Sequence, residues 1–172
     1  MARETNNYAL LFIDNPVEIS PSSRFRKWKD TTEEEMKVFV AIEIAMGLCS
    51  KNRLTDYWDR FWLTQTPSYT EVMPRDRYHI LRSFLHFCDN EGQHPRGHDL
   101  YDPLYKIRPV IDLVKDTYLD AYVPHQEISV DEIMKGFKGR LSFKEYIPNK
   151  PKKWGIKIWS LCDSRNGFNL RW

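Results

Sequence analysis

Two aspartates stand where a carboxylate could bind a metal ion. Asp131 lies in the apolar alternation of residues 127–134, which predicts a strand inside a sheet. A carboxylate is costly to bury there unless a cation compensates it, so Asp131 is a candidate metal ligand, with a cap, a turn or a salt bridge as the alternative. Glu132 would point to the opposite face of the same strand. Asp163, at the end of a second apolar alternation, is more typical of a residue that caps a turn.

Other signatures of catalysis or metal binding are missing from the sequence. Glycine-rich phosphate loops, GxSxG and HExxH do not occur. His94 and His98 would need a helix to share a metal ion, and Pro95 and Gly97 disfavour one. An odd number of widely spaced cysteines excludes a disulfide framework and indicates buried thiols in a reducing compartment. The cysteines are Cys49, Cys88 and Cys162.

Basic residues are concentrated beside Asp131. Residues 1–130 hold 16 basic and 20 acidic residues, whereas residues 135–157 hold eight basic residues and one acidic residue, Glu145. Such a segment attracts polyanions, nucleic acid first among them, although a loop that its lysines merely keep soluble is the alternative. The candidate DNA-binding residues are Lys135, Lys138, Arg140, Lys144, Lys150, Lys152, Lys153 and Lys157.

The composition is that of a globular chain of about one domain. Hydrophobic residues make up 41% and charged residues 29% of 172 residues. The absence of a long apolar run and of an N-terminal apolar segment with a cleavage site disfavours a membrane span and a secretory signal.

The first 123 residues predict a mainly helical region. Residues 1–30 are expected to be irregular, with turns at Asn15-Pro16 and Ser20-Pro21. Thr31 and Thr32 precede three glutamates and predict a helix start with a capping box. Apolar residues on nearly all sides of 36–48 predict burial on most sides. Further helices are expected at 54–63, 74–87 and 103–122, with Trp58, Phe61 and Trp62 in the core.

The last fifty residues predict strands. Residues 127–134, 154–162 and 168–172 alternate in the manner of strands, and 154–162, apolar on both faces, is expected to be central. Asn166-Gly167 predicts a hairpin turn. Helices followed by a sheet that is begun but not finished would suit the front part of a larger protein, because so small a sheet leaves an open apolar edge.

Four segments of this region together resemble the piggyBac transposase family. Their order and spacing match without obvious gaps, and upstream segments around Trp28, Ala45-Met46-Gly47 and Leu85-His86-Phe87 agree. The resemblance therefore extends over nearly the whole chain. The four segments are Ser129-Val130-Asp131-Glu132, Gly136-Phe137-Lys138-Gly139-Arg140, residues 146–157 and Leu161-Cys162-Asp163.

The resemblance implies a fold and a chemistry. It implies a helical domain for dimerisation and DNA binding over 1–123, followed over 124–172 by the first strands of a ribonuclease H-like α/β domain. In the family, three aspartates hold two divalent metal ions, such as Mg²⁺, that cut and join transposon ends. Asp131 matches the first of them, whereas Asp163 is a motif residue outside the metal site. The resemblance also implies DNA as partner, a homodimer, a nuclear location and no membrane.

The expected function is that of an amino-terminal portion of a transposase. One aspartate is not expected to hold two metal ions, so we expect at most DNA binding and no catalysis by this chain alone. The alternatives are a domesticated DNA-binding or protein-interaction factor and a gene fragment without function.

Overall fold

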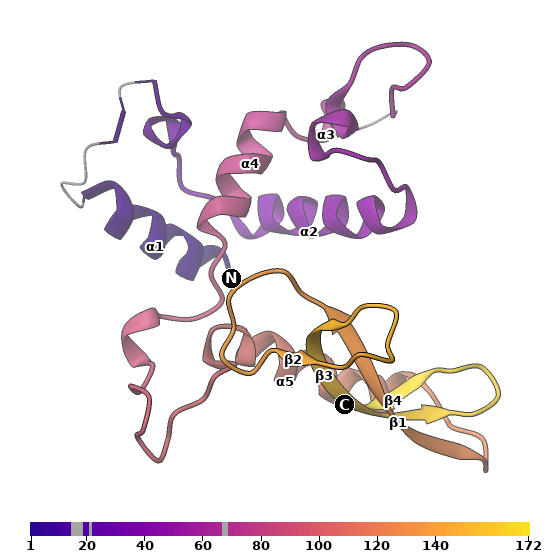
Figure 1. The fold of residues 1–172 in the computed structure, drawn as a ribbon. Helices are drawn as coiled ribbons and strands as arrows, with labels where there is room; N and C mark the ends of the chain where they lie inside the picture. The colour runs from indigo at the N-terminus through magenta and orange to yellow at the C-terminus, as the bar shows by residue number, and fades with distance from the viewer. Residues whose placement is uncertain (15–18, 21, 67–68) are drawn as a thin grey trace. The chain divides into compact units, whose positions relative to one another are not determined.

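The computed structural model describes residues 1–14, 19–20, 22–66 and 69–172, which form two compact units, Met1–Gln93 and His94–Trp172. The first unit is helical, and the second combines helix α5 with an antiparallel sheet (Figure 1). In the sequence, the division between the two units falls 30 residues before the domain boundary expected at 123/124. The reason is that α5 packs with the sheet. That boundary stays a prediction. The turn expected at Asn15-Pro16, and Pro21 of the next, lie outside the described residues.

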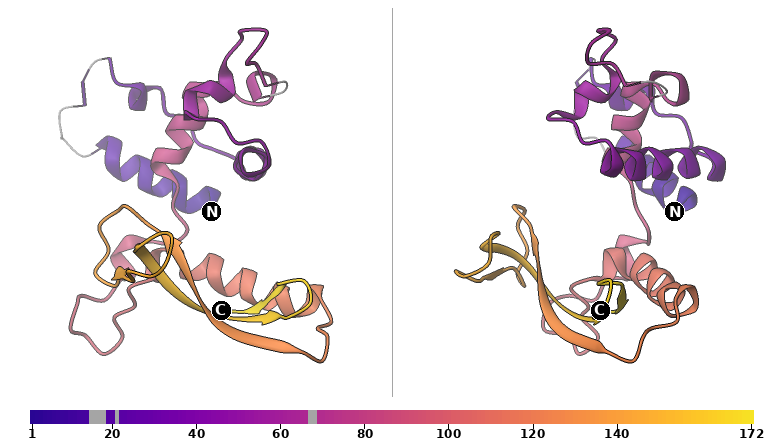
Figure 2. Two further views of the ribbon diagram at one scale, coloured as in Figure 1. Left: turned by 45° about the vertical axis from the view of Figure 1, so that its right-hand side comes forward. Right: turned by 90° about the vertical axis from the view of Figure 1, so that its right-hand side faces the viewer.

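The helical unit consists of four α-helices and three short 3₁₀ helices within the described residues. Helices α2 and α4 provide most of its core, and α1 packs against α4 (Figure 2). The elements are α1 (Ala2–Asp14), η1 (Arg24–Lys27), α2 (Glu33–Leu48), η2 (Leu54–Trp58), α3 (Tyr69–Val72), α4 (Arg75–Phe84) and η3 (Asn90–Gly92).

Helix α1 corrects the expectation of an irregular start. Thr5 and Ala9 are fully buried one turn apart, and the rings of Tyr8 and Phe12 on the same face pack against Phe84 of α4. Asn6 lies beside them, and its side chain exchanges two hydrogen bonds with the backbone of Thr31, at 2.8 and 3.0 Å. Asn6, one of the polar residues that had indicated an irregular start, here fixes the helix to its neighbour.

Helix α2 begins where the sequence predicts. The hydroxyl of Thr32 accepts a hydrogen bond from the backbone N–H of Glu35 at 3.2 Å, as an N-cap does. Burial on most sides was wrong, however, because Met36, Phe39 and Ile42 are buried while Ile44 is exposed. The helix therefore covers the core with one face and leaves a second apolar face uncovered in this unit.

The core of the helical unit is rich in aromatic rings. Tyr78 of α4 stacks on Phe39 of α2 with ring centroids 5.3 Å apart. Trp58 packs beside them and donates a hydrogen bond to the carbonyl of Met73 at 2.8 Å, as expected for a core residue. Placing Phe61 and Trp62 in the core was wrong, because both are exposed. The chain leaves the helical conformation after Trp58, so the two rings lie on an outer loop.

The second unit begins with a loop and a helix. Asp102 accepts a hydrogen bond from the N–H of Leu104 at 2.9 Å and pairs with Arg108 at 2.7 Å. These contacts hold the chain in a short 3₁₀ turn, so the α-helix starts at Arg108 rather than at Pro103. The elements are η4 (Tyr105–Ile107), α5 (Arg108–Ala121), β1 (Ile128–Gly136), β2 (Glu145–Tyr146), β3 (Trp154–Asp163) and β4 (Asn169–Arg171).

Strand β3 is the centre of the sheet, as predicted. β1 pairs with it antiparallel over its whole length, from Ile128 opposite Asp163 to Gly136 opposite Gly155. β2 and β4 pair with its other edge, one at each end. The hairpin turn before β4 is also confirmed, since Gly167 has a positive φ of 72° and donates to the carbonyl of Asp163 at 2.8 Å.

The cysteines lie in a different environment from the one expected. Within the described residues no disulfide joins the three cysteines, but Cys49 is exposed and Cys88 and Cys162 are only partly covered, so buried thiols were wrong. Over the described ranges, the structure has no helix long and apolar enough to cross a bilayer.

Candidate nucleic-acid interface

Asp131 lies on β1 opposite Ser160 of β3 and is exposed. Its carboxylate accepts a hydrogen bond from the backbone N–H of Glu132 at 2.7 Å. The cost of burial that made Asp131 a candidate therefore does not apply in this chain. Within the described ranges, no three His, Cys, Asp or Glu side chains gather where they could hold a metal ion. The residues described do not make a two-ion site, and the role of Asp131 as first ligand stays a prediction.

Glu132 points to the other face of β1 and binds two of the eight basic candidates. Its carboxylate lies 3.0 Å from the ammonium of Lys157 and 3.9 Å from that of Lys150. Lys150 also donates to the backbone carbonyl of Glu132 at 3.1 Å. The hydrogen bond to Glu132 raises the pKa of Lys157. These two lysines are therefore engaged by Glu132 and are the least available to a phosphate.

Asp163 caps the β3–β4 turn, as the sequence indicates, and does more. It accepts the backbone N–H of Arg165 at 2.9 Å, the N–H of His125 at 2.8 Å and the hydroxyl of Tyr122 at 2.8 Å. The backbone N–H of His125 is the largest of several donors that hold the pKa of this buried carboxyl well below its usual range. Asp163 thus fixes the segment between α5 and β1, which is a structural role.

Five basic candidates remain free. Within the described part of the chain, they form no ion pair, and all five are exposed. Lys144 is intermediate, since its ammonium donates to the carbonyl of Gly139 at 3.0 Å and lies 5.4 Å from the centre of the Trp154 ring. The five are Lys135, Lys138, Arg140, Lys152 and Lys153.

Aromatic side chains lie among these cations, which sequence reasoning missed. A pocket of about 570 Å³ is lined by Gly136, Phe137 and Trp154 together with three lysines. The ring of Tyr146 lies 4.9 Å from that of Trp154. The signal in the sequence was the alternation of aromatic and basic residues along 137–154, which indicates nucleic acid more specifically than charge alone does. The three lysines are Lys138, Lys144 and Lys152.

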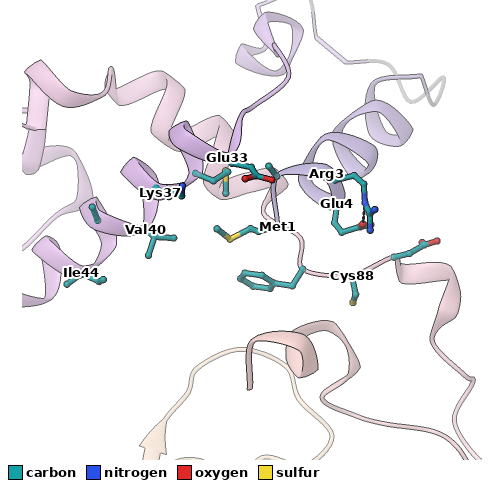
Figure 3. A pocket seen from close by; sticks show the side chains of 13 residues that line it. Met1, Arg3, Glu4, Glu33, Lys37, Val40, Ile44 and Cys88 are labelled. Carbon is teal, nitrogen blue, oxygen red and sulfur yellow. Dashed lines mark hydrogen bonds and ion pairs between the residues drawn. The ribbon is translucent and has the colours of Figure 1, made fainter. Parts of the chain in front are cut away.

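A larger groove of about 1040 Å³ lies in the helical unit (Figure 3). Val40 and Ile44 of α2 line it with Met1 and Cys88, and Arg3 pairs with Glu4 at its edge at 2.8 Å. The groove is mainly apolar and gathers no set of side chains suited to catalysis. We assign no chemistry to it.

Comparison with known proteins defines the class of this protein as a transposase or transposase derivative. A family model described as Transposase IS4 matches residues 1–171. Human PiggyBac transposable element-derived protein 3 is 30% identical over 129 residues, which cover 74% of this chain and 21% of that protein. Human PiggyBac transposable element-derived protein 2 is 29% identical over 135 residues, covering 78% and 22%. The chain belongs to the piggyBac transposase family.

A solved structure agrees in fold. The piggyBac transposase in a cryo-EM synaptic complex with hairpin DNA aligns with a TM-score of 0.78 and 30% identity, over 99% of this chain and 34% of that one. Helices followed by an antiparallel sheet are therefore an arrangement that this chain shares with part of a piggyBac transposase. The chain spans about a fifth of the length of the curated relatives and about a third of the solved one.

Proposed function

We propose that this chain is a transposase-derived DNA-binding protein whose basic segment, residues 135–157, neutralises phosphates without reading sequence. The observation that carries the proposal is the set of five exposed basic side chains without an ion pair in the described residues. Lysine acts mainly as a point charge on phosphate, and none of these residues lies on a helix that could read bases. The DNA in the solved relative's complex supports the same partner.

A second part of the proposal concerns the sheet and Asp131. We propose that β1, β3 and β4 correspond to the opening strands of a ribonuclease H-like domain, 124–172, and that Asp131 supplies its first metal ligand. Its exposed carboxylate supports this, because no basic side chain among the described residues pairs with it. Mg²⁺ or Mn²⁺ held by three such aspartates would activate the attacking oxygen and stabilise the leaving one. With only Asp131 of the three metal-binding aspartates, the chain by itself does not cleave DNA.

Two properties of the complete family are proposed for this chain as well. Because chromosomal DNA would be its partner, we propose a nuclear location, which imaging of a fluorescently tagged chain would contradict if the signal stayed outside the nucleus. We also propose that residues 1–123 support a homodimer. Sedimentation equilibrium tests it, and a monomer at all concentrations would contradict it.

A salt titration tests DNA binding. Fluorescence anisotropy with a labelled duplex should give Kd on the order of 10⁻⁴–10⁻⁶ M at physiological salt. The slope of log K against log salt should be about −3 to −4 if about four phosphates are contacted. Changing Lys138, Lys152 and Lys153 together to Gln should flatten the slope by about 2 to 3 units for every sequence alike.

The matched control uses the two lysines that bind Glu132. Changing Lys150 and Lys157 to Gln removes two charges from the same basic segment but should leave most of the slope, because their ammonium groups are already paired. A segment that only keeps the protein soluble predicts an unchanged slope in both variants, and that result would refute the proposal.

A further inference from the structure

We propose that the pocket lined by Phe137, Trp154 and three lysines takes an unpaired nucleotide of single-stranded DNA. The base would stack on the aromatic rings, and the phosphates on either side would lie beside Lys138, Lys144 and Lys152. This inference rests on the proposed DNA binding and adds to it a substrate class, since it separates unpaired from duplex DNA.

The backbone builds the pocket at the end of the β1–β3 ladder. Gly136 lies opposite Gly155, and the N–H of Phe137 donates to the carbonyl of Trp154 at 3.2 Å. This bond continues the pairing by one residue beyond the last ladder pair. It holds the two aromatic residues at neighbouring positions although they are 17 positions apart in the sequence, so the pocket is held by backbone pairing rather than by a free loop.

Two glycines make room for its walls. A Cβ on Gly139 would lie 2.4 Å from the ring carbon Cε1 of Phe137, so the ring lies over this glycine and would have to move if a side chain stood there. A Cβ on Gly136 would lie 2.6 Å from Cδ of Lys152, whose stem crosses that glycine. The conformation of both wall residues thus depends on the absence of a side chain beneath them.

The aromatic surface of the pocket is uncovered. Trp154 is 56% and Phe137 38% exposed, and Tyr146, against Trp154, is 49% exposed. Large rings usually lose most of their exposure when a protein folds, and three exposed rings in one patch indicate a surface that a ligand covers. Flat rings bind another flat π-system best, and every nucleobase presents one.

The charges favour an anionic ligand at the same place. Lys138 and Lys152 have no acidic partner in the described residues, and Lys144 lies over Trp154 with its ammonium 5.4 Å from the ring centre. Glu145 of β2 is the single acidic residue of the segment and does not line the pocket. A volume of about 570 Å³ falls within the range of small-ligand sites and suits one nucleotide. Stacking rings beside backbone-neutralising cations are how proteins bind single strands.

Duplex DNA cannot use the rings. Its bases are stacked and paired, so only phosphates would meet the surface, and the lysines would bind them with no help from Phe137 or Trp154. The proposal therefore predicts two separable contributions. One follows charge and salt, and the other requires an accessible base.

An abasic oligonucleotide separates these contributions because it keeps the phosphates and lacks the bases. We would measure the binding of labelled octathymidylate and of an abasic octamer of equal charge to the full chain by anisotropy, at the same series of salt concentrations. The chain should bind octathymidylate roughly 5-fold or more tightly. Trp154→Leu should remove this preference and leave binding of the abasic octamer and its salt slope unchanged.

Trp159 provides a matched control. It lies on the same strand, is 61% exposed and also has a lysine over its ring, Lys157 at 4.8 Å, but it faces the other side of β3. Trp159→Leu should keep the preference for octathymidylate. Phe137→Leu, outside the strand, should reduce the preference and guards against a folding defect of Trp154→Leu, which circular dichroism would detect.

The outcomes distinguish the two proposals. Equal binding of both octamers by the wild-type chain, or an unchanged preference in a folded Trp154→Leu variant, would overturn the stacking pocket while the salt slope still supported phosphate binding. A salt slope near zero on the abasic octamer would instead overturn the proposed function, on which the pocket depends.

Discussion

The carboxylate of Asp163 accepts two hydrogen bonds from one residue, His125. The backbone N–H lies 2.8 Å away and the ring Nδ1 2.7 Å away. Tyr122 donates a third, at 2.8 Å. The end of β3 is therefore joined to the segment that leads from α5 into β1, and one carboxylate fixes where the first strand of the sheet begins.

Replacing Asp163 by Asn should destabilise the second unit in a pH-dependent way. Because its pKa in the folded chain is well below the unfolded value of about 3.9, the carboxylate stabilises the fold fully above that value and less as the pH falls below it. At pH 7 we expect the midpoint of thermal unfolding to fall by roughly 5 °C. Melting curves between pH 7 and pH 3 check this. A difference from wild type that did not shrink below about pH 4 would contradict it.

Arg77 should contribute far more to the stability of the fold than Arg75. Arg77 forms a fork with Glu35, at 2.7 and 2.6 Å, and its guanidinium lies 5.0 Å from the centre of the Trp28 ring. This hydrogen bonding lowers the pKa of Glu35. Arg77→Ala should reduce the free energy of unfolding by about 1–3 kcal/mol. Arg75→Ala, which loses only an exposed contact to Asp76 at 3.7 Å, should change it by less than about 0.5 kcal/mol in urea titrations. Similar values for both would show that the fork is not stabilising.

Two glycine-to-alanine changes should have opposite effects on the free energy of unfolding. A Cβ on Gly155 would lie 2.3 Å from the backbone carbonyl oxygen of Lys135, so Gly155→Ala must move β1 or β3 and should cost at least about 1–3 kcal/mol. Gly47, in α2, has open space around the position of a Cβ atom. Gly47→Ala should therefore raise the free energy of unfolding by about 0.5–1 kcal/mol. Urea unfolding of both variants decides this. A stable Gly155→Ala variant would mean that the close β1–β3 approach is wrong.

The chain should not cut DNA with Mg²⁺ or Mn²⁺. Asp131 is one of three aspartates that the family resemblance implies, and two-metal catalysis needs several carboxylates to hold both ions. Incubation with a transposon-end duplex and a denaturing gel would reveal nicks. Metal-dependent nicking that Asp131→Ala abolishes would refute this prediction and would show that the chain completes its metal site by other means.

Sequence patterns predicted the elements whose signals are local. The cap at Thr32 and the turn at Gly167 depend on residues within a few positions of each other, and both were found. Helix α1 was missed because the polar residues and turn signals of the first thirty residues favoured a loop, although Tyr8, Ala9 and Phe12 recur at helical spacing on its packed face. In α2, the apolar pattern does not indicate that Met36 is covered and Ile44 exposed, because burial depends on which neighbours are present.

The candidate interface shows the same limit. The concentration of lysines was visible in the sequence, but which of them are free was not. The pairing of Glu132 with Lys157 follows from the register of β1 on β3, which no local pattern specifies across the intervening segment. The neighbouring positions of Phe137 and Trp154 depend on the same register.

The central place of β3 also determines the order in which the sheet forms during synthesis. β1, β2 and β4 each pair with β3. At ribosomal rates β1 would wait roughly 1–5 s for the end of β3, with its backbone unpaired and Val130 and Ile133 exposed. The lysine-rich segment emerges directly behind β1, and charge beside an apolar strand opposes aggregation. Released chains that end near residue 153 should therefore stay soluble but protease-sensitive in β1, whereas chains that extend through β3 should be protected there.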